Sequence, residues 1–357
     1  MLRIAVCGDG AVAHSIAAVC AGRGHAVRVL AANAQQWNGR LSTTLADGSR
    51  FVARIAFATA DPAAALDGAD IVFVCEPHAE VEPTLRRIAP HIAVDALVGA
   101  VPGFGGFGPL ARRWLPQSAC LFGTQRIPFV VRLCKYGRSV GIGGVRRQTF
   151  IATMPAEQAR PVAELLAQVL GVRTVPVSHY FSVELSPSNS IVNPARLYAL
   201  FGADAQGRVP AGGEFFTGWD LPSSRMLLAL DRELQQARAC VPRDTSFVAP
   251  ILMQYDANDA ETLTLRFRAL RALAGRRIPV CGAGIDPDCS YLGEDIDIGL
   301  TLLRDALHLA GAQTPLMDDI LGWRRSLLTA GERRRWARRP RVVAAFESIE
   351  ALAQALD

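Results

Sequence analysis

The fold of this chain is decided by the stretch Leu2-Arg3-Ile4-Ala5-Val6-Cys7-Gly8-Asp9-Gly10-Ala11-Val12-Ala13. Its apolar residues up to Cys7 predict a buried strand, and a helical pattern follows the glycines as far as Gly22. A second strand is predicted over Ala26–Leu30. A strand, a glycine-rich turn, a helix and another strand in this order are typical of a dinucleotide-binding unit.

The glycine turn meets specific physical demands. Gly8 lets the chain leave the strand in a tight turn, and Gly10 lets backbone N–H groups approach a pyrophosphate. Ala13 permits close packing of the helix on the strand, and the helix directs its N-terminal N–H groups at the phosphates. We therefore expect Gly8, Gly10, Ala11, Val12 and Ala13 to bind the cofactor.

Length and composition narrow the class of protein. The 357 residues suffice for about two domains, and a chain that is 50% hydrophobic and 20% charged suits a globular protein with a large core. No apolar run reaches the roughly 18–20 residues that span a bilayer, and no signal peptide precedes the first strand, so we expect a cytoplasmic protein without membrane contact. The eight cysteines lack metal-ligand or disulfide spacing, so no metal site is expected.

The basic residues do not indicate a nucleic-acid partner. The net charge is +5, and Lys135 is the only lysine among 38 basic residues. The densest basic run, residues 333–339, predicts a solvated helix face.

Strands and helices alternate in the first half of the chain. Its strands are continuously apolar, which predicts a parallel sheet covered on both faces, and right-handed crossovers make that sheet doubly wound. Further edge strands are expected at residues 130–138, 139–143 and 149–153. The predicted strands are Ile71–Cys75, Ala96–Val101 and Ala119–Gly123, and the predicted helices are Glu80–Ile88 and Phe107–Trp114.

Helical patterns dominate beyond Val177. The predicted fold class is therefore α/β, with an N-terminal Rossmann-type doubly wound parallel sheet over residues 1–175 and a second, mostly α-helical domain over residues 176–357. Glycine-rich breaks at Gly202–Gly213 and Gly282–Gly284 are candidate cleft loops. The expected helices include Phe181–Phe201, Ser223–Ala239, Thr245–Tyr255, Ala260–Ala274, Ile296–Ala310 and Leu316–Leu328.

The end of the second strand favours NADP(H) over NAD(H). A carboxylate there usually accepts a hydrogen bond from the ribose 2′-hydroxyl of NAD, and no acidic residue is present from Ala31 to Thr44. Asn33 can donate to either cofactor. Arg40 is the candidate partner of a 2′-phosphate, with an ordinary surface arginine as the alternative.

Two segments of the second half combine polar and apolar residues unusually. Asn189 and Asn193 lie four residues apart in an apolar helical pattern and so share a face. Glu294 and Asp295 stand at the predicted start of a helix, where the dipole favours acids. Helix capping is the alternative interpretation of both segments.

With the glycine turn, these segments resemble the opine dehydrogenase family. The resemblance includes Pro77 and Pro102-Gly103 after predicted strands, residues 127–132 with 135–138, Asn189–Pro194, residues 291–296 and 314–318. It implies an NAD(P)-dependent enzyme that joins the nitrogen of an amino acid to an α-keto acid, such as pyruvate or 2-oxoglutarate, and reduces the imine. It also implies a Rossmann domain with a helical substrate domain.

The resemblance implies site residues, with two departures. Family members usually carry a histidine where this chain has Asn193, and an arginine where it has Ser290, while Asp295 is retained. Asparagine cannot exchange a proton near neutral pH, so the proton donor has moved, with His179 as a candidate, or the reaction differs. A solvent-exposed loop histidine is the alternative for His179. We expect catalysis by Asn193, Asp295 and His179, and cofactor contacts from Pro77 and Pro102. Substrate contacts are expected from Asn189 and Tyr291, and from Arg126, Arg132 and Arg196 because guanidinium matches a carboxylate.

Two other functions remain open at this level. A ketopantoate-reductase-like enzyme would share the Asn189–Pro194 pattern, but its catalytic lysine position is Leu185 here. A cofactor-binding protein with reduced catalysis would suit the loss of the histidine. A homodimer is possible in each case.

Overall fold

The computed structural model describes residues 1–186, 189–202, 213–281, 284–337 and 342–357. Its contacts divide the chain into two compact units. The first comprises Met1–Glu184 with Ala353–Asp357, and the second comprises Leu185–Leu352. The division thus falls after Glu184, beyond the boundary expected after residue 175, and the C-terminal residues return to the first unit.

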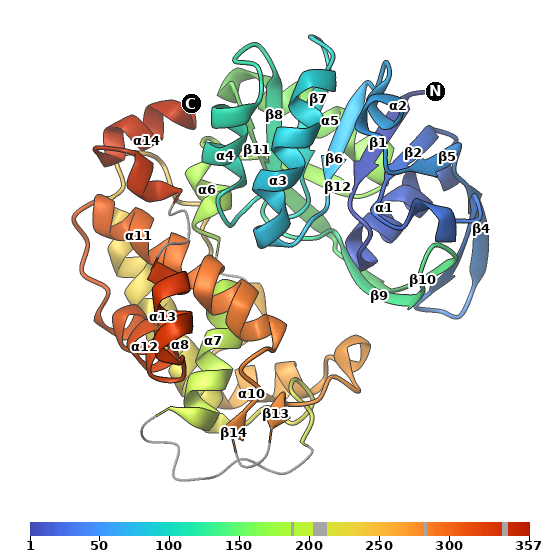
Figure 1. Cartoon of the computed structure of the whole chain (residues 1–357). Coiled ribbons are helices and arrows are strands. Elements are labelled where there is room, and N and C mark those ends of the chain that lie inside the picture. Colours follow the sequence, from blue (N-terminus) through green and yellow to red (C-terminus); the bar gives the residue numbers. More distant parts are fainter. Residues whose placement is uncertain (187–188, 203–212, 282–283, 338–341) are drawn as a thin grey trace. The chain divides into compact units, whose positions relative to one another are not determined.

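The first unit is built on an eight-stranded sheet, with the order β12-β11-β8-β7-β6-β1-β2-β5 (Figure 1). Strand β1 (Arg3–Cys7) lies between β2 (Ala26–Leu30) and β6 (Ile71–Val74) and is parallel to both. The sheet is parallel except at one pairing, where β11 is antiparallel to β8. The predicted α/β fold with a doubly wound, mainly parallel sheet is confirmed. The remaining strands are β5 (Phe57–Thr59), β7 (Leu97–Ala100), β8 (Cys120–Thr124), β11 (Gln148–Met154) and β12 (Arg173–Pro176).

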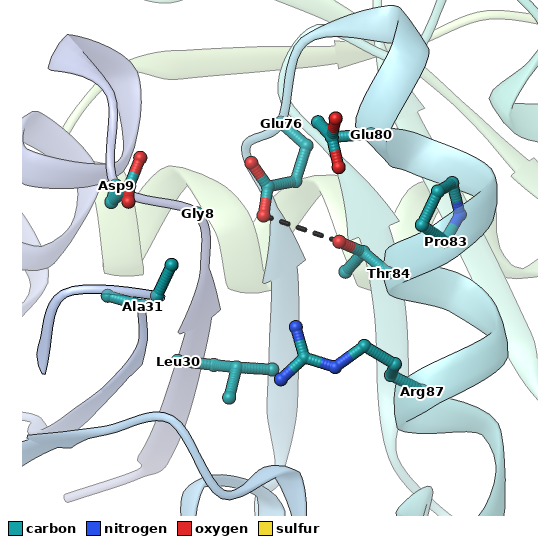
Figure 2. Close-up of a pocket in the computed structure, with 10 residues that line it drawn as sticks. Gly8, Asp9, Leu30, Ala31, Glu76, Glu80, Pro83, Thr84 and Arg87 are labelled. Atoms are coloured by element: carbon teal, nitrogen blue, oxygen red, sulfur yellow. Dashed lines mark hydrogen bonds between the residues drawn. The ribbon is translucent and has the colours of Figure 1, made fainter.

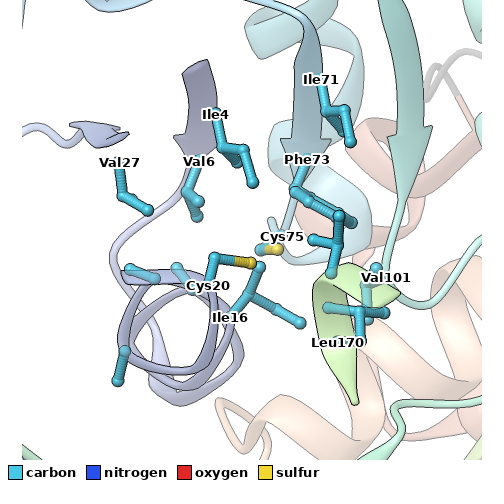
Figure 3. Close-up of a cluster of buried hydrophobic side chains, with 14 of the residues drawn as sticks. Ile4, Val6, Ile16, Cys20, Val27, Ile71, Phe73, Cys75, Val101 and Leu170 are labelled. Carbon is cyan, nitrogen blue, oxygen red and sulfur yellow. The ribbon is translucent and has the colours of Figure 1, made fainter. Parts of the chain in front are cut away.

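Helices cover both faces of this sheet. Helix α1 (Ala11–Gly22) packs against α5 (Ala159–Leu170) on one face, and α2 (Pro62–Leu66), α3 (His78–Ile88) and α4 (Phe107–Trp114) form a row on the other. Figure 3 shows the apolar core beside α1, where side chains of the three central strands meet the helix. Because these strands are buried on both faces of the sheet, they are apolar at almost every position, and this pattern predicts parallel strands.

A second, four-stranded sheet follows the order β4-β3-β10-β9. The prediction that residues 130–138 and 139–143 extend the main sheet is wrong, because β9 (Phe129–Lys135) and β10 (Ser139–Val145) join the unpredicted hairpin of β3 (Arg40–Leu45) and β4 (Arg50–Arg54). Helix α1 contacts strands of both sheets. The sequence does not show these two strands as apolar runs, because only alternate side chains of the hairpin, such as Leu41, are buried.

The second unit is mostly helical. A single helix over Phe181–Phe201 is wrong, because α6 (Phe181–Glu184) stops at the unit boundary and α7 starts at Asn189. Of the predicted helix Thr245–Tyr255 only α9 (Ile251–Gln254) is formed. The candidate loops 202–213 and 282–284 fall mostly outside the described residues. The other elements are α7 (Asn189–Phe201), α8 (Leu221–Ala237), α10 (Ala260–Arg268), β13 (Val280–Cys281), β14 (Gly284–Ile285), η6 (Tyr291–Leu300), α11 (Thr301–Leu309), α12 (Pro315–Ser326), α13 (Ala330–Ala337) and α14 (Ile349–Ala355), which crosses into the first unit.

Element η6 is a π-helix at the centre of this unit, and it packs against α7, α11 and α12. A buried ion pair ties it to α12: Arg324 donates from Nε and Nη2 to the two carboxylate oxygens of Asp297, at 2.8 and 3.0 Å. Both side chains are almost fully buried. A two-pronged pair of this kind fixes the orientation of one helix against the other.

Replacing Arg324 by methionine is expected to destabilise the protein by about 3–5 kcal/mol, because Asp297 would remain buried without its counter-charge. Urea unfolding measures the change. The matched control is Arg325→Met at the next position of α12, where the arginine is exposed. Equal losses in the two variants would contradict a special role for the buried pair.

Candidate functional site

A cavity of about 230 Å³ opens at the end of the central strands of the first unit. Gly8 follows β1, Leu30 ends β2 and Glu76 lies just beyond β6, so the cavity lies where the strand order reverses. Crevices at this point of open α/β sheets bind ligands. Figure 2 shows the cavity between the strand ends and α3. Its lining is Gly8, Asp9, Leu30, Ala31, Ala32, Glu76, Glu80, Pro83, Thr84 and Arg87.

The two glycines of the turn are needed for different reasons, one for the fold of the turn and the other for space beside it. Gly8 has φ +129°, and a Cβ there would lie 2.6 Å from the carbonyl oxygen of Cys75. Gly10 has an ordinary φ of −78°, and a Cβ there would meet nothing within 4 Å. Gly8 is therefore required by the protein itself. Gly10 leaves space in front of the N-terminus of α1, and that space fits the phosphates of a dinucleotide.

A histidine behind the turn holds it in place. The amide of Gly137 donates to Nε2 of His14 at 2.8 Å, so Nδ1 carries the proton and faces the carbonyl oxygen of Gly10, also at 2.8 Å. Burial lowers the pKa of His14, which keeps the ring neutral. Tyr136 donates from its hydroxyl to Asp9 at 3.0 Å. The turn is thus attached to the hairpin between β9 and β10.

The cavity contains charges of both signs. Burial, followed by the nearby charge of Asp9, raises the pKa of Glu76 to about 7. Thr84 donates to Glu76 at 3.3 Å. On the opposite side of the cavity, Arg87 donates from Nη2 to the carbonyl oxygen of Ala60 at 3.0 Å.

The other residues expected to contact the cofactor do not line this cavity. Pro77 precedes α3 and Pro102 follows β7, which places both at the same edge of the sheet as Gly8. Asn33 is exposed before a short 3₁₀ turn. Arg40 is exposed on β3, opposite Arg54 in the second sheet.

In the second unit, the structure brings Asn193 and Asp295 together. Asn193 donates from Nδ2 to Oδ2 of Asp295 at 2.8 Å, and both side chains are buried. The Oδ1 atom of Asn193 has no hydrogen-bond partner among the described residues. Burial raises the pKa of Asp295 to about 7, against the lowering effect of the Asn193 hydrogen bond. Buried polar atoms are normally hydrogen-bonded, so this amide oxygen without a partner marks the pair as a candidate site.

The segment that contains Asp295 is not the start of a helix, as the sequence suggested, but the interior of the π-helix η6. π-Helical turns are rare and frequently occur at functional sites. A Cβ on Gly299 would lie 2.5 Å from the Oγ of Ser190, so a glycine is needed for α7 to approach η6. This close approach brings Asn193 of α7 within hydrogen-bonding distance of Asp295.

Tyr291 begins the same π-helix. Its ring stacks on Phe215 with centroids 4.5 Å apart. Burial raises the pKa of Tyr291. Arg276 is exposed, whereas Tyr291 is half-buried. Asn189, the first residue of α7, is exposed.

Arg196 is occupied by contacts within the second unit. Its Nη1 lies 2.7 Å from the hydroxyl of Ser223 and 2.8 Å from Asp220, and its Nη2 donates to the carbonyl oxygen of Gly218 at 2.7 Å. The side chain is 1% exposed. These contacts hold the start of α8, and the carboxylate contact expected of Arg196 stays a prediction.

His179 is buried in the first unit, so its interpretation as a solvent-exposed loop histidine is wrong. Its Nδ1 accepts from the amide of Phe181 at 3.0 Å, and its Nε2 lies 2.9 Å from the carboxylate of Asp357. His179 precedes the short helix α6, not the helix that carries Asn193. Its ring thus contacts the C-terminal residue within the first unit, and a catalytic role of His179 stays a prediction.

The two remaining arginines lie in the first unit. Arg126 is half-buried between β8 and β9, and Arg132 is exposed on β9. The structure does not place either residue in the lining of the cavity.

Sequence reasoning missed Glu76 and Arg87. Glu76 directly follows a predicted strand whose end lies beside the glycine turn, so its position was available as a signal. Arg87 is near the end of α3, and only the packing of that helix brings it to the cavity.

Neither a metal site nor a membrane segment is found in the described part of the chain. No group of three or more His, Cys, Asp or Glu residues there could hold a metal ion. No helix among the same residues is long and apolar enough to cross a membrane.

The comparisons with known sequences agree with one another. Residues 176–328 match the model of the NAD/NADP octopine/nopaline dehydrogenase α-helical domain. The chain is 30% identical to an uncharacterised protein of Sinorhizobium fredii over 90% of this chain and 94% of that protein. It is 28% identical to octopine dehydrogenase of Pecten maximus over 90% and 89% of the two chains.

Solved structures share the fold. An octopine dehydrogenase with NADH and L-arginine has a TM-score of 0.83 at 23% identity, covering 100% of this chain and 99% of that one. An NADP⁺-bound yersinopine dehydrogenase has a TM-score of 0.68 at 12% identity, covering 99% and 97%. A ketopantoate reductase from Ralstonia solanacearum, itself assigned only provisionally, has a TM-score of 0.60 at 21% identity, covering 94% and 99%.

Two alanine variants separate the roles of the turn glycines. Gly8→Ala is expected to destabilise the protein by about 2 kcal/mol or more, because of its φ and the contact with Cys75. Gly10→Ala should change stability by less than about 1 kcal/mol and weaken NADPH binding strongly. Thermal unfolding and fluorescence titration measure the two effects. Wild-type affinity in Gly10→Ala would show that no pyrophosphate approaches this residue.

Asp295→Asn is expected to stabilise the protein above neutral pH. The pKa of Asp295 is raised in the fold, so its contribution to stability is complete below about pH 4 and is lost as the pH rises to about 7. The variant should match the wild type near pH 4 and exceed it by about 2–4 kcal/mol at pH 8. Urea unfolding across this range tests the expectation, with Asp288→Asn, an exposed carboxylate nearby, as the control. A constant difference at all pH values would contradict it.

Proposed function

The chain belongs to the octopine/nopaline dehydrogenase family, and from that premise we propose that it catalyses the NAD(P)H-dependent reductive condensation of an amine with an α-keto acid. The amine would be an amino acid or a related compound, and pyruvate or 2-oxoglutarate the keto acid. Octopine dehydrogenase structures hold NADH with L-arginine, agmatine or pyruvate, and these pairings support the proposed substrate classes.

The observation that carries the proposal is the buried pair of Asn193 and Asp295. Asn193 donates to the carboxylate, which fixes the orientation of its own amide and leaves Oδ1 to accept an N–H group. The carboxylate of Asp295 stabilises positive charge on an amine or imine nitrogen. The two side chains therefore suit the nitrogen of the substrate, which donates a hydrogen bond as an amine and carries a positive charge as a protonated imine.

Asp295 can also take over the proton transfer for which other family members use a histidine. A carboxyl with a pKa of about 7 both accepts and donates a proton near neutral pH. It can take a proton from an ammonium group and return it to the oxygen that leaves as water when the imine forms. Asn193 then positions the acid, and no histidine is needed for the proton.

The first unit supplies the cofactor site of the proposal. The space in front of Gly10 and the cavity beyond Gly8 would hold the dinucleotide. When bound, the reduced nicotinamide supplies the hydride. The absence of an acid after β2 favours NADP(H).

A guanidinium for the substrate carboxylate is available in the second unit. Arg276 is exposed, and its positive charge acts on Tyr291, a residue of the π-helix that carries Asp295. Guanidinium matches a carboxylate with two parallel hydrogen bonds. Arg276 is thus a stronger candidate than Arg196, whose guanidinium is already paired.

Oxidation of NADPH in the presence of pyruvate or 2-oxoglutarate and a panel of amino acids tests this function. We expect turnover that depends on both substrates, and a loss of about a hundredfold or more in Asp295→Asn. Glu261→Gln, an exposed surface change in the same unit, is the matched control. Turnover with a keto acid alone would indicate a ketopantoate-reductase-like enzyme, and cofactor binding without any turnover would indicate a binding protein.

A further inference from the structure

The position of Arg87 is set by contacts on two sides. The residue lies near the C-terminal end of α3, and its Nη2 donates to the carbonyl oxygen of Ala60 at 3.0 Å. Ala60 follows β5, and the amide of Ala31 donates to Thr59 of β5 at 3.0 Å. The guanidinium therefore extends over the end of β2, beside Leu30, as Figure 2 shows.

The end of β2 is where dinucleotide-binding sheets recognise the adenosine ribose. A carboxylate there accepts a hydrogen bond from the 2′-hydroxyl of NAD, whereas an arginine nearby binds the 2′-phosphate of NADP. The positions after β2 are Ala31, Ala32 and Asn33, which include no carboxylate. The guanidinium of Arg87 is the one cation in the cavity lining among the described residues.

The carboxylates of the cavity lie apart from this position. Figure 2 shows Glu76 between Gly8 and Thr84, and its hydrogen bond with Thr84 holds it on that side. Its pKa of about 7 also reduces its negative charge at neutral pH. The end of β2 thus faces a cation, while Asp9 lies in the glycine turn, Glu76 follows β6 and Glu80 lies in the first turn of α3.

We propose that Arg87 recognises the 2′-phosphate of NADP(H), so that this chain selects its cofactor from helix α3 and not from the loop after β2. The inference rests on the proposed dinucleotide function and adds the residue that decides between the two cofactors. It differs from the expectation for Arg40, which the structure places on β3 outside the cavity lining. Guanidinium suits this role because it binds phosphate through two hydrogen bonds.

The test uses the full chain and the adenosine fragments of the two cofactors. Calorimetry with adenosine 2′,5′-bisphosphate and with 5′-AMP isolates the 2′-phosphate from nicotinamide binding. The wild type should bind the bisphosphate at least about tenfold more tightly than 5′-AMP. Arg87→Met, which keeps most of the side-chain length, should lose about 10–100-fold in affinity for the bisphosphate and almost none for 5′-AMP.

Two arginine variants serve as controls. Arg86→Met changes the preceding residue of α3, which pairs with Glu82 and lies over the ring of Trp114, outside the cavity lining. It should leave both affinities unchanged. Arg40→Met should do the same. Thermal unfolding confirms that each variant is folded before its affinities are compared.

Several results would overturn the proposal. Equal losses for both nucleotides in Arg87→Met would make the residue an adenine contact, and loss in Arg40→Met alone would return the role to β3. A wild type that prefers 5′-AMP, with affinity reduced in Glu76→Gln, would assign ribose recognition to an acid. None of these outcomes affects dinucleotide binding itself, whereas absence of NADH and NADPH binding to the wild type would refute the proposed function.

Discussion

The close approach of Gly8 to the carbonyl oxygen of Cys75 is the constraint on which the dinucleotide site depends. Because no Cβ intervenes, the chain leaves β1 against the end of β6 and turns directly into α1. The same turn opens the cavity and leaves the space before Gly10. His14 and Tyr136 then attach the turn to the second sheet, so the glycine loop is held from behind by ring contacts and hydrogen bonds.

Buried polar groups organise the helical unit in a comparable way. Polar side chains are costly inside a helical core unless they are paired, and the π-helix contributes two such groups, Asp295 and Asp297, two residues apart. Asp297 is fully paired with Arg324, which fixes η6 against α12. Asp295 has one amide donor in Asn193, and burial raises its pKa in spite of that hydrogen bond. The first carboxylate gives stability to the unit, and the second retains the reactivity that the proposed chemistry needs.

Apolar periodicity was sufficient to predict the parallel strands, because a strand buried on both faces is apolar at every position. The hairpin of β3 and β4 escaped prediction since it buries only alternate residues, and β9 and β10 were consequently assigned to the wrong sheet. The helix predicted over Phe181–Phe201 is two separate helices, α6 and α7. The sequence could not supply the partners of Arg196 and His179, because Asp220 and Asp357 are brought to these side chains only by folding.

The sequence by itself determined the α/β class, the glycine turn and the family, since these depend on local order and spacing. It also identified Asn193 and Asp295 as residues of interest. Only the tertiary structure decided that these two side chains meet, because they lie on α7 and η6, about a hundred residues apart in the chain, as their hydrogen bond records. It likewise brought Arg87 to the end of β2. Charge and hydrogen-bond partners depend on how helices pack, and no local pattern specifies that packing.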